Sequence, residues 1–524
     1  MIRATATWRL GAVAGFVLVP SLGLSAATAS AEPVGEHIDL YQDGVAVTSG
    51  ALLRLPSGTA ATYLEGSRVL DPASLDAAVL AAGVDPADGE ANRLAQVAGA
   101  PIDAAALLDA SAAADAAAAS RAWLAAGTVP GAGGPYADLG EDALLDLRAL
   151  VLDNGASLAA PSPKWRYVWP RDASFTAAAL ARTGHVDEAL DVLGFLGQVQ
   201  EEDGSFHARY LPDGTGVPDD RGLQSDGTGW ALWAAAVVVA EAPEADRADV
   251  VARLRPLVDA STAHALSLVA GAGALPPASS DYWEVEPTSL TLGTAGPLLA
   301  GLEAASDFYR TAATLEHPRR ATVYGAGLGR VPRPATTAEA AGTAESTAGS
   351  TAEVVLDASA TAGPWTRVVQ TSRAAERLRT AVEDAFGSQG YPRHVTGGPR
   401  DASTAFVLPP FQPEPLDGAQ QAWQASVTEM LRPAGGLAPG AGWREDGISW
   451  TPQTSLYALT AASSSDAEDR ADAREWLRWV DEHRTASGAI PEKVLADGSP
   501  AAVAPLSWSS ALVVLALVEL DAAG

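Results

Sequence analysis

Apolar residues recur at helical spacing over most of this chain, starting near Asp103. An Ala-rich run leads to Ala126, and leucines and valines then fall on one helical face from Leu144 to Val151. Comparable patterns continue almost to the C-terminus. They predict further helices over residues 173–183, 186–198, 229–241, 249–269, 296–314, 374–386, 420–432, 456–462, 468–482 and 506–520.

Two kinds of helix alternate in this pattern. The segments 230–240 and 511–518 are apolar on nearly all sides, whereas 466–482 carries charge along one face. A helix that is apolar all round is buried on every side, and a one-faced helix covers the outside of a core. The alternation therefore predicts an all-α fold, a layered helical barrel or toroid, rather than a row of separate bundles.

The pattern near the N-terminus differs from the rest. Residues 37–70 combine β-branched alternation with Asp-Gly and Ser-Gly turn signals, which predicts a few short strands. We therefore divide the chain into a small, partly β segment at 32–100 and a helical toroid at 101–524. Within the toroid, residues 331–364 are rich in Ala, Thr, Ser and Gly without a period, and this composition indicates a surface loop.

The first 31 residues have the layout of a secretory signal peptide. Arg3 and Arg9 precede an apolar stretch, and the small residues Ala29-Ser30-Ala31 follow it. We expect cleavage after Ala31 and a secreted, extracellular protein; an N-terminal membrane anchor is the alternative. No later apolar segment reaches the roughly 20 residues that a spanning helix needs, so no membrane association is expected after cleavage.

Composition and charge exclude several classes of partner and site. The chain has 524 residues, 48% of them hydrophobic and 19% charged, which is typical of a folded protein. Its 64 acidic and 34 basic residues give a net charge of −30, which disfavours nucleic acid and anionic membranes and favours a neutral substrate. The absence of cysteine excludes disulfides and thiolate sites, and the seven histidines are scattered. We expect no metal site, no cofactor and a monomer.

Polar and aromatic residues cluster just before each apolar helix. Asp172, Asp226 and Glu284 follow one another at intervals of 54 and 58 positions, and three later clusters continue the series around Asp401, Trp450 and Trp508. Parallel inner helices would bring all six clusters to one mouth of a toroid. For any single member, such as Asp172 or Asp226, helix capping is the alternative reading.

Tryptophan is unusually abundant, with 14 residues against 8 phenylalanines. Several tryptophans lie beside the polar clusters, and indole faces are suited to stacking on the C–H faces of sugar rings. Filling of a wide helical core is the alternative for each of them. Those beside the clusters are Trp165, Trp169, Trp283, Trp443, Trp450 and Trp508.

These motifs together resemble glycoside hydrolase family 15, the inverting glucoamylase, glucodextranase and trehalase-like enzymes. The resemblance extends from about Pro130 to the C-terminus and implies an (α/α)6 six-hairpin toroid. It rests on Tyr167-Val-Trp-Pro-Arg-Asp172, Asp226-Gly-Thr-Gly-Trp230, Tyr282-Trp-Glu284, Gly488-Ala-Ile-Pro-Glu492 and Pro505-Leu-Ser-Trp508.

The resemblance also implies roles for individual residues. Glu284 would be the general acid and Glu492 the general base, while Arg171 and Asp172 would hold the sugar at the non-reducing end. Further substrate contacts implied by it are Trp169, Trp283, Trp508 and Arg444. Val285 and Lys493 stand where an acidic residue and a glutamine are frequent in the family, so the preferred linkage stays open.

The chemistry of the two glutamates is consistent with this resemblance. Hydrolysis with inversion needs one carboxyl to protonate the leaving oxygen and another, about 6.5–9.5 Å away, to activate water. We expect the neighbouring Trp283 to give Glu284 an apolar contact that raises its pKa toward about 6, as a general acid requires. The alternative for Glu284 is a carboxylate that stabilises the start of a helix, and the alternative for Glu492 is an ordinary surface residue.

The sequence thus predicts an exported, exo-acting α-glucoside hydrolase that releases glucose from chain ends of a neutral α-glucan or α-glucoside. Two other functions stay open at this point. One is a non-catalytic glycan-binding protein on a decayed hydrolase scaffold. The other is a polysaccharide lyase or epimerase on a related toroid, although a lyase acting on acidic sugars needs several cations beside a Tyr or His base.

Overall fold

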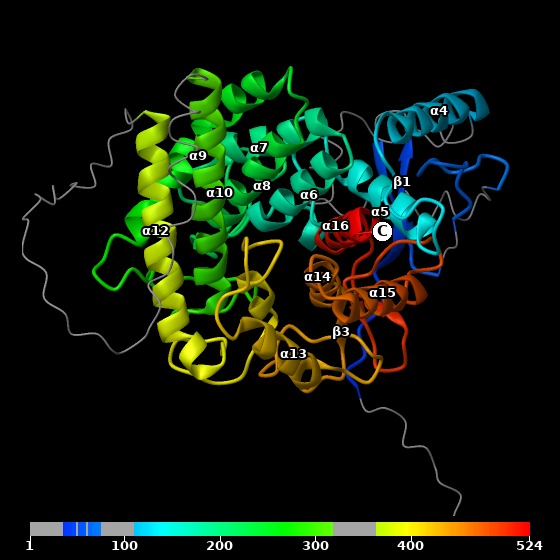
Figure 1. The fold of residues 1–524 in the computed structure, drawn as a ribbon. Helices are drawn as coiled ribbons and strands as arrows, with labels where there is room; N and C mark the ends of the chain where they lie inside the picture. Colours follow the sequence, from blue (N-terminus) through cyan, green and yellow to red (C-terminus); the bar gives the residue numbers. More distant parts are fainter. Residues whose placement is uncertain (1–34, 49–50, 59–60, 75–108, 318–362, 524) are drawn as a thin grey trace, which may run out of the picture.

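The computed structural model describes residues 35–48, 51–58, 61–74, 109–317 and 363–523. Within them, helices alternate along the chain between an outer and an inner layer (Figure 1). The outer helices are α5 (Ala137–Leu150), α7 (Val186–Val199), α9 (Arg247–Leu268), α12 (Pro364–Ala385), α13 (Ala419–Met430) and α15 (Ala467–Glu482). The inner elements are α6 (Pro170–Arg182), α8 (Ser225–Glu241), α10 (Leu292–Glu316), the 3-10 helix η3 (Ala402–Val407), α14 (Thr451–Ala462) and α16 (Ser507–Ala523).

The inner elements form a closed ring. Each contacts the next in chain order, from α6 through α8, α10, η3 and α14 to α16, and α16 packs back against α6. Each outer helix precedes one inner element, so the chain builds an (α/α)6 toroid. The predicted fold class is therefore confirmed.

Burial explains the two kinds of sequence pattern. Every residue of α14 is buried, whereas α15 buries only Asp469, Ala473, Leu477, Trp479 and Val480. A helix in the inner ring has neighbours on all sides, and an outer helix faces solvent along one side. The apolar segments and the charged-face segments of the sequence occupy these two positions.

Several inner helices begin earlier than the apolar pattern predicts. Helix α6 begins at Pro170 instead of residue 173, and α14 begins at Thr451, with Pro452 in its first turn, instead of residue 456. Proline is well tolerated in a first turn because its missing N–H has no helical partner there. Arg171 and Asp172, which were predicted to precede α6, therefore lie within its first turn, whereas Trp450 is the N-cap of α14.

The fourth inner element is much shorter than expected. Arg400 and Asp401 were predicted to precede an apolar helix, but only the 3-10 helix η3 follows them. The Asp401 carboxylate accepts a hydrogen bond from the Ser403 N–H at 3.1 Å and caps this element. Pro409 and Pro410 then follow, and proline both lacks an N–H donor and disfavours helical backbone before it.

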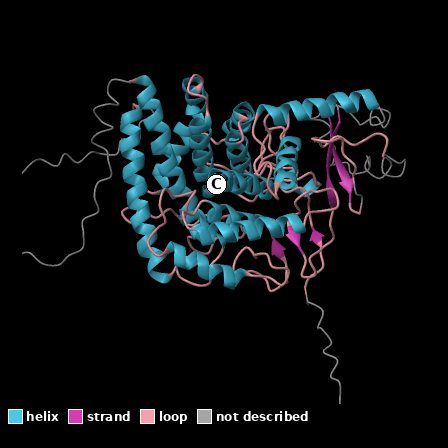
Figure 2. Cartoon of the chain, turned by 45° about the vertical axis from the view of Figure 1, so that its right-hand side comes forward, coloured by secondary structure: helices cyan, strands magenta, loops and turns pink. Residues whose placement is uncertain are grey.

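Two small sheets accompany the ring and lie toward the same side of it in Figure 2. Strands β1 (Gln42–Thr48) and β2 (Ala51–Pro56) form an antiparallel hairpin, as the pattern over 37–70 predicts. Strands β3 (Ser449–Trp450), β4 (Lys493–Val494) and β5 (Pro500–Ala501) form the other sheet. The hairpin is joined to the segment after β5, because the Tyr41 N–H donates to the Ala502 carbonyl at 2.7 Å.

The remaining described elements are α4 (Ala110–Ala126) and the 3-10 helices η1 (Pro163–Trp165) and η2 (Gly387–Gln389). The predicted signal peptide and most of the predicted loop at 331–364 lie outside the described residues. In the part of the chain that is described, no helix combines the length and the apolar character needed to cross a bilayer.

Candidate active site

A cavity of about 360 Å³ opens at one end of the ring, where several inner helices begin. The first turns of α6, α14 and α16 line it, together with the turn before α10 and the residue before β4. Most of the predicted site residues lie on its wall. These are Trp169, Arg171, Asp172, Trp283, Glu284, Glu492 and Trp508.

Arg171 and Asp172 form the buried part of this wall. Arg171 Nη2 lies 3.0 Å from Asp172 Oδ2, and Arg171 Nη1 lies 4.0 Å from Asp226 Oδ2 on α8. The guanidinium also lies 4.4 Å from the ring centre of Trp508. Burial raises the pKa of Asp172, and it raises the pKa of Asp226 to about 7.

Helix capping does not account for these two carboxylates. The N-cap of α6 is Trp169 and that of α8 is Gln224, so Asp172 and Asp226 both lie inside the first turn. Asp172 pairs with Arg171, and Asp226 accepts a hydrogen bond from the adjacent Gly227 N–H at 2.9 Å. Asp172 and its partner Arg171 line the cavity, and Asp226 lies outside the lining, near Arg171.

Unsatisfied polar atoms gather around the same cavity. Arg171 Nε and Nη1 are buried without a hydrogen-bond partner, and so are the indole N–H groups of four lining residues. Those four are Trp283, Trp443, Trp450 and Trp508. Buried donors are normally paired, so a wall with so many free donors is suited to a ligand rich in hydroxyl groups.

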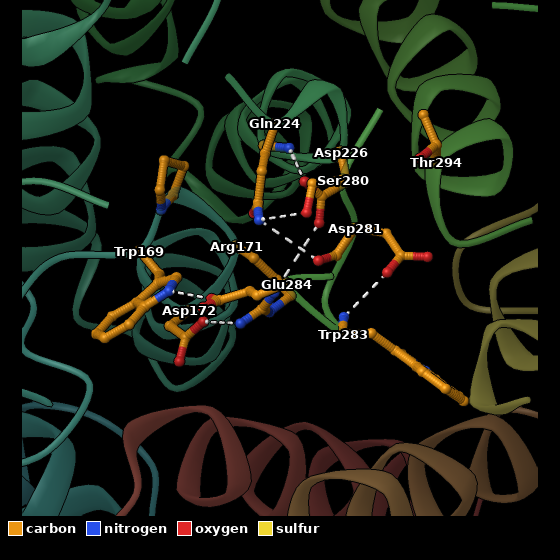
Figure 3. Close-up of polar contacts among 12 residues, drawn as sticks. Trp169, Arg171, Asp172, Gln224, Asp226, Ser280, Asp281, Trp283, Glu284 and Thr294 are labelled. Atoms are coloured by element: carbon orange, nitrogen blue, oxygen red, sulfur yellow. Dashed lines mark hydrogen bonds and ion pairs between the residues drawn. The ribbon is translucent and has the colours of Figure 1, made fainter. Parts of the chain in front are cut away.

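Glu284 is held in an unusual backbone conformation. Its φ is +53°, which is uncommon for a residue other than glycine, and its N–H donates to the Asp281 carbonyl at 2.7 Å. The carboxylate is directed to the cavity, where Oε1 accepts from the Trp169 indole N–H and Oε2 pairs with Arg221 Nη1. Figure 3 shows the contact with Trp169. Strained backbone of this kind concentrates at functional sites.

The expected contact between Trp283 and Glu284 is wrong. Figure 3 shows the Trp283 ring directed away from Glu284. Its ring centre lies 3.9 Å from the Arg393 guanidinium and 4.8 Å from that of Trp443. The tight turn sends the two adjacent side chains to different sides, so Glu284 is surrounded by an indole N–H and a guanidinium rather than by an apolar ring.

Glu492 is fixed through its backbone. It directly precedes β4, its N–H donates to the Val503 carbonyl at 2.7 Å, and its carbonyl accepts from the Thr451 N–H at 3.1 Å. The residue is 8% exposed, and Lys493 Nζ lies 3.3 Å from its Oε2. The small sheet therefore presents one carboxylate to the cavity from the side of α14. Glu284 and Glu492 line the same cavity; their separation of about 6.5–9.5 Å stays a prediction.

Arg393, which belongs to none of the sequence motifs, supports the turn carrying Glu284. Arg393 is 4% exposed, its Nη2 lies 2.8 Å from Asp281 Oδ1, and its Nη1 lies 2.5 Å from Asp401 Oδ2. Asp281 in turn accepts from the Trp283 N–H at 3.0 Å. A lone arginine in a Tyr-Pro-Arg segment belongs to no motif that would indicate this contact, because Asp281 is 112 positions away and Asp401 is eight positions away without a regular spacing.

Arg444 is placed differently from the other predicted contacts. It is exposed, does not line the cavity, and its guanidinium lies 5.8 Å from the Trp443 ring centre. Its role as a sugar contact stays a prediction. Among the described residues, no group of three or more His, Cys, Asp or Glu side chains is arranged to hold a metal ion.

Comparisons with known proteins agree with this fold. A glycosidase variant solved in complex with glucose aligns with a TM-score of 0.52 and 21% identity, over 72% of this chain and 95% of that one. A bacterial glucoamylase complexed with acarbose aligns with a TM-score of 0.54 and 14% identity, over 84% of this chain and 62% of that one. At these identities the alignments show a shared toroid.

The sequence comparisons are more limited. An uncharacterized glycosyl hydrolase of Methanocaldococcus jannaschii is 36% identical over 94 residues, which is 18% of this chain. The match spans 15% of that relative's length. No family model matches the chain.

Proposed function

We propose that this protein is a glycoside hydrolase of family 15 that acts with inversion on α-glucosides and releases glucose from non-reducing ends. The observation that carries the proposal is the pair of carboxylates, Glu284 and Glu492, on the wall of one buried cavity. They come from opposite sides of the ring opening, one before α10 and the other before β4. In this proposal Glu284 protonates the leaving oxygen and Glu492 activates water.

The buried end of the cavity supports action at chain ends. Arg171 and Asp172 are 7% and 4% exposed, and in this proposal they close the inner end of the cavity against a continuing polymer. Their charged groups, with the unpaired Arg171 Nε and Nη1, would satisfy hydroxyls of a terminal sugar. The indole rings of Trp169 and Trp508 would then flank that sugar.

The proposed substrate is neutral, in keeping with the net charge of −30 and with a cavity lining that is rich in aromatic side chains and carries charges of both signs. The structural neighbours solved with glucose and with acarbose are consistent with a carbohydrate ligand. Export is part of the proposal because residues 1–31 have the pattern of a signal peptide.

The experiment is a hydrolysis assay on the mature chain, from residue 32, with maltooligosaccharides, isomaltooligosaccharides and trehalose in separate reactions. Proton NMR of the earliest product distinguishes the two anomers before mutarotation. Inversion at an α-glucoside gives β-glucose first. Early α-glucose would mean a covalent intermediate and would remove Glu492 from the role of base. Binding of these sugars without any hydrolysis would favour the glycan-binding alternative.

A further inference from the structure

Arg221 makes a direct ion pair with the carboxylate that we assign as the acid. It lies in the segment before α8, and its Nη1 pairs with Glu284 Oε2. The other oxygen, Oε1, accepts from the Trp169 indole N–H. One carboxylate oxygen therefore accepts a hydrogen bond and the other faces a cation, an environment that suits the ionised form.

The ion pair with Arg221 is incompatible with the role of Glu284 as a general acid. Glu284 must carry a proton when it meets the leaving oxygen, and a protonated carboxyl has one fewer free acceptor position. A cation at Oε2 also favours the ionised carboxylate electrostatically. Arg221 must therefore release Oε2 before Glu284 can take up and deliver a proton.

The surroundings of Arg221 allow that release. Its side chain is 38% exposed, and its Nε lies 3.3 Å from Asp219 Oδ2, a second acceptor on the same segment. Gly222, the next residue, has a φ of +81° and open space on its Cβ side. Arg221 can thus keep Asp219 as a partner while it gives up Glu284.

Other charged and titratable groups share the cavity, but none of them forms an ion pair with Glu284 among the described residues. Arg209 pairs with Asp219 and lies 5.0 Å from the Trp169 ring centre, so it supports the indole that donates to Glu284. Apart from these, the ionisable groups on the wall are Lys164, Tyr167, Arg171, Asp172, Tyr282 and Glu492.

We propose that Arg221 is a positioning residue that keeps Glu284 ionised while the cavity is empty and releases it when substrate binds. This inference rests on the proposed function. On release, Glu284 takes one proton from solvent, and it passes that proton to the leaving oxygen as the glycosidic bond breaks. Substrate binding is therefore coupled to proton uptake at one carboxyl.

The test compares the pH dependence of kcat/KM with that of kcat, using whichever α-glucoside the chain hydrolyses. The alkaline limb of kcat/KM reports Glu284 in the free enzyme, and that of kcat reports it in the complex. In the wild type we expect the limb of kcat/KM to lie at lower pH than the limb of kcat. Arg221→Gln removes the cation and should raise the limb of kcat/KM by about one pH unit, close to that of kcat.

Two further variants separate this role from a structural one. Arg221→Lys keeps the charge and should keep the limb of kcat/KM near its wild-type position. Arg253→Gln removes the same charge from an exposed pair with Asp191, far from the cavity lining, and should leave both limbs unchanged.

The outcomes distinguish this inference from the proposed function. If Glu284→Gln abolishes turnover but Arg221→Gln leaves the two limbs where they were, the positioning role is wrong and the hydrolase assignment stands. If no α-glucoside is hydrolysed, or Glu284→Gln retains wild-type turnover, the assignment of Glu284 as acid fails, and the role of Arg221 fails with it.

Discussion

Replacing Arg393 with methionine should destabilise the protein far more than removing a surface arginine. Arg393 bridges Asp281 and Asp401, which are 1% and 0% exposed, and the change leaves both carboxylates buried without their cation. Breaking a buried ion pair by removing one partner typically costs about 3–5 kcal/mol. Asp281 and Asp401 each keep hydrogen bonds to backbone N–H groups, so we expect a loss within this range rather than twice as large.

The assay is urea unfolding at pH 7, followed by tryptophan fluorescence and by far-ultraviolet circular dichroism. With an m value of about 3 kcal/mol/M or more, as expected for a chain of this size, a loss of about 3–5 kcal/mol lowers the urea midpoint by about 1 M. Coincident transitions from the two probes would justify the two-state treatment. Arg393→Lys keeps the charge but loses the forked geometry, and its midpoint should fall between those of the wild type and Arg393→Met.

The matched control is Arg253→Met, which removes an arginine whose side chain is 50% exposed and pairs with Asp191 at 2.5 Å. Exposed ion pairs contribute about 0–1 kcal/mol, so its midpoint should hardly move. Equal effects of the two substitutions would refute the view that Arg393 compensates buried charge. A folded Arg393→Met protein should also turn over more slowly, because the turn that positions Glu284 loses its support.

Three further predictions concern the cavity. Glu492→Gln should lower kcat by about 100-fold or more, and added azide should restore part of the turnover of an activated substrate; full activity in the variant would exclude Glu492 as base. Asp172→Asn should raise KM and lower kcat with an unchanged urea midpoint, whereas a lower midpoint with normal kinetics would indicate a purely structural role. Burial raises the pKa of Asp226 to about 7 in the folded state, above its unfolded value near 3.9, so its stabilising contribution is present below pH 4 and is lost as pH rises to 7. Asp226→Asn should therefore show a smaller difference in urea midpoint between pH 5 and pH 8 than the wild type, and an unchanged difference would contradict the shift.

The sequence was sufficient to predict the two layers of helices. A helix buried on all sides is apolar all round, and a helix buried on one side is apolar on one face only. The sequence was less informative about where helices begin. Arg171 and Asp172 are polar, so the pattern placed them before a helix, yet Pro170 starts α6 and puts both within its first turn. The length of the fourth inner element was overestimated, since the prolines after Leu408 stop η3 within two turns.

The candidate site was likewise predicted only in part from the sequence. Motifs brought Glu284, Glu492 and most of the tryptophans to one cavity, because each starts a segment that returns to the same end of the ring. Arg221 and Arg393 were missed, since their partners are set by the folded chain and not by a local spacing. For the same reason the surroundings of Glu284 were predicted incorrectly, because adjacency to Trp283 in sequence does not mean contact across a tight turn.

The closed ring has a consequence for how the chain reaches its final state. Helix α16, the last one, packs between α14 and α6 and carries Trp508 on the cavity wall. During synthesis the apolar faces of α14 and α6 that α16 covers therefore stay exposed until α16 itself has been made. Shortened chains that end before Ser507 should accumulate as aggregating, protease-sensitive species rather than as smaller folded domains.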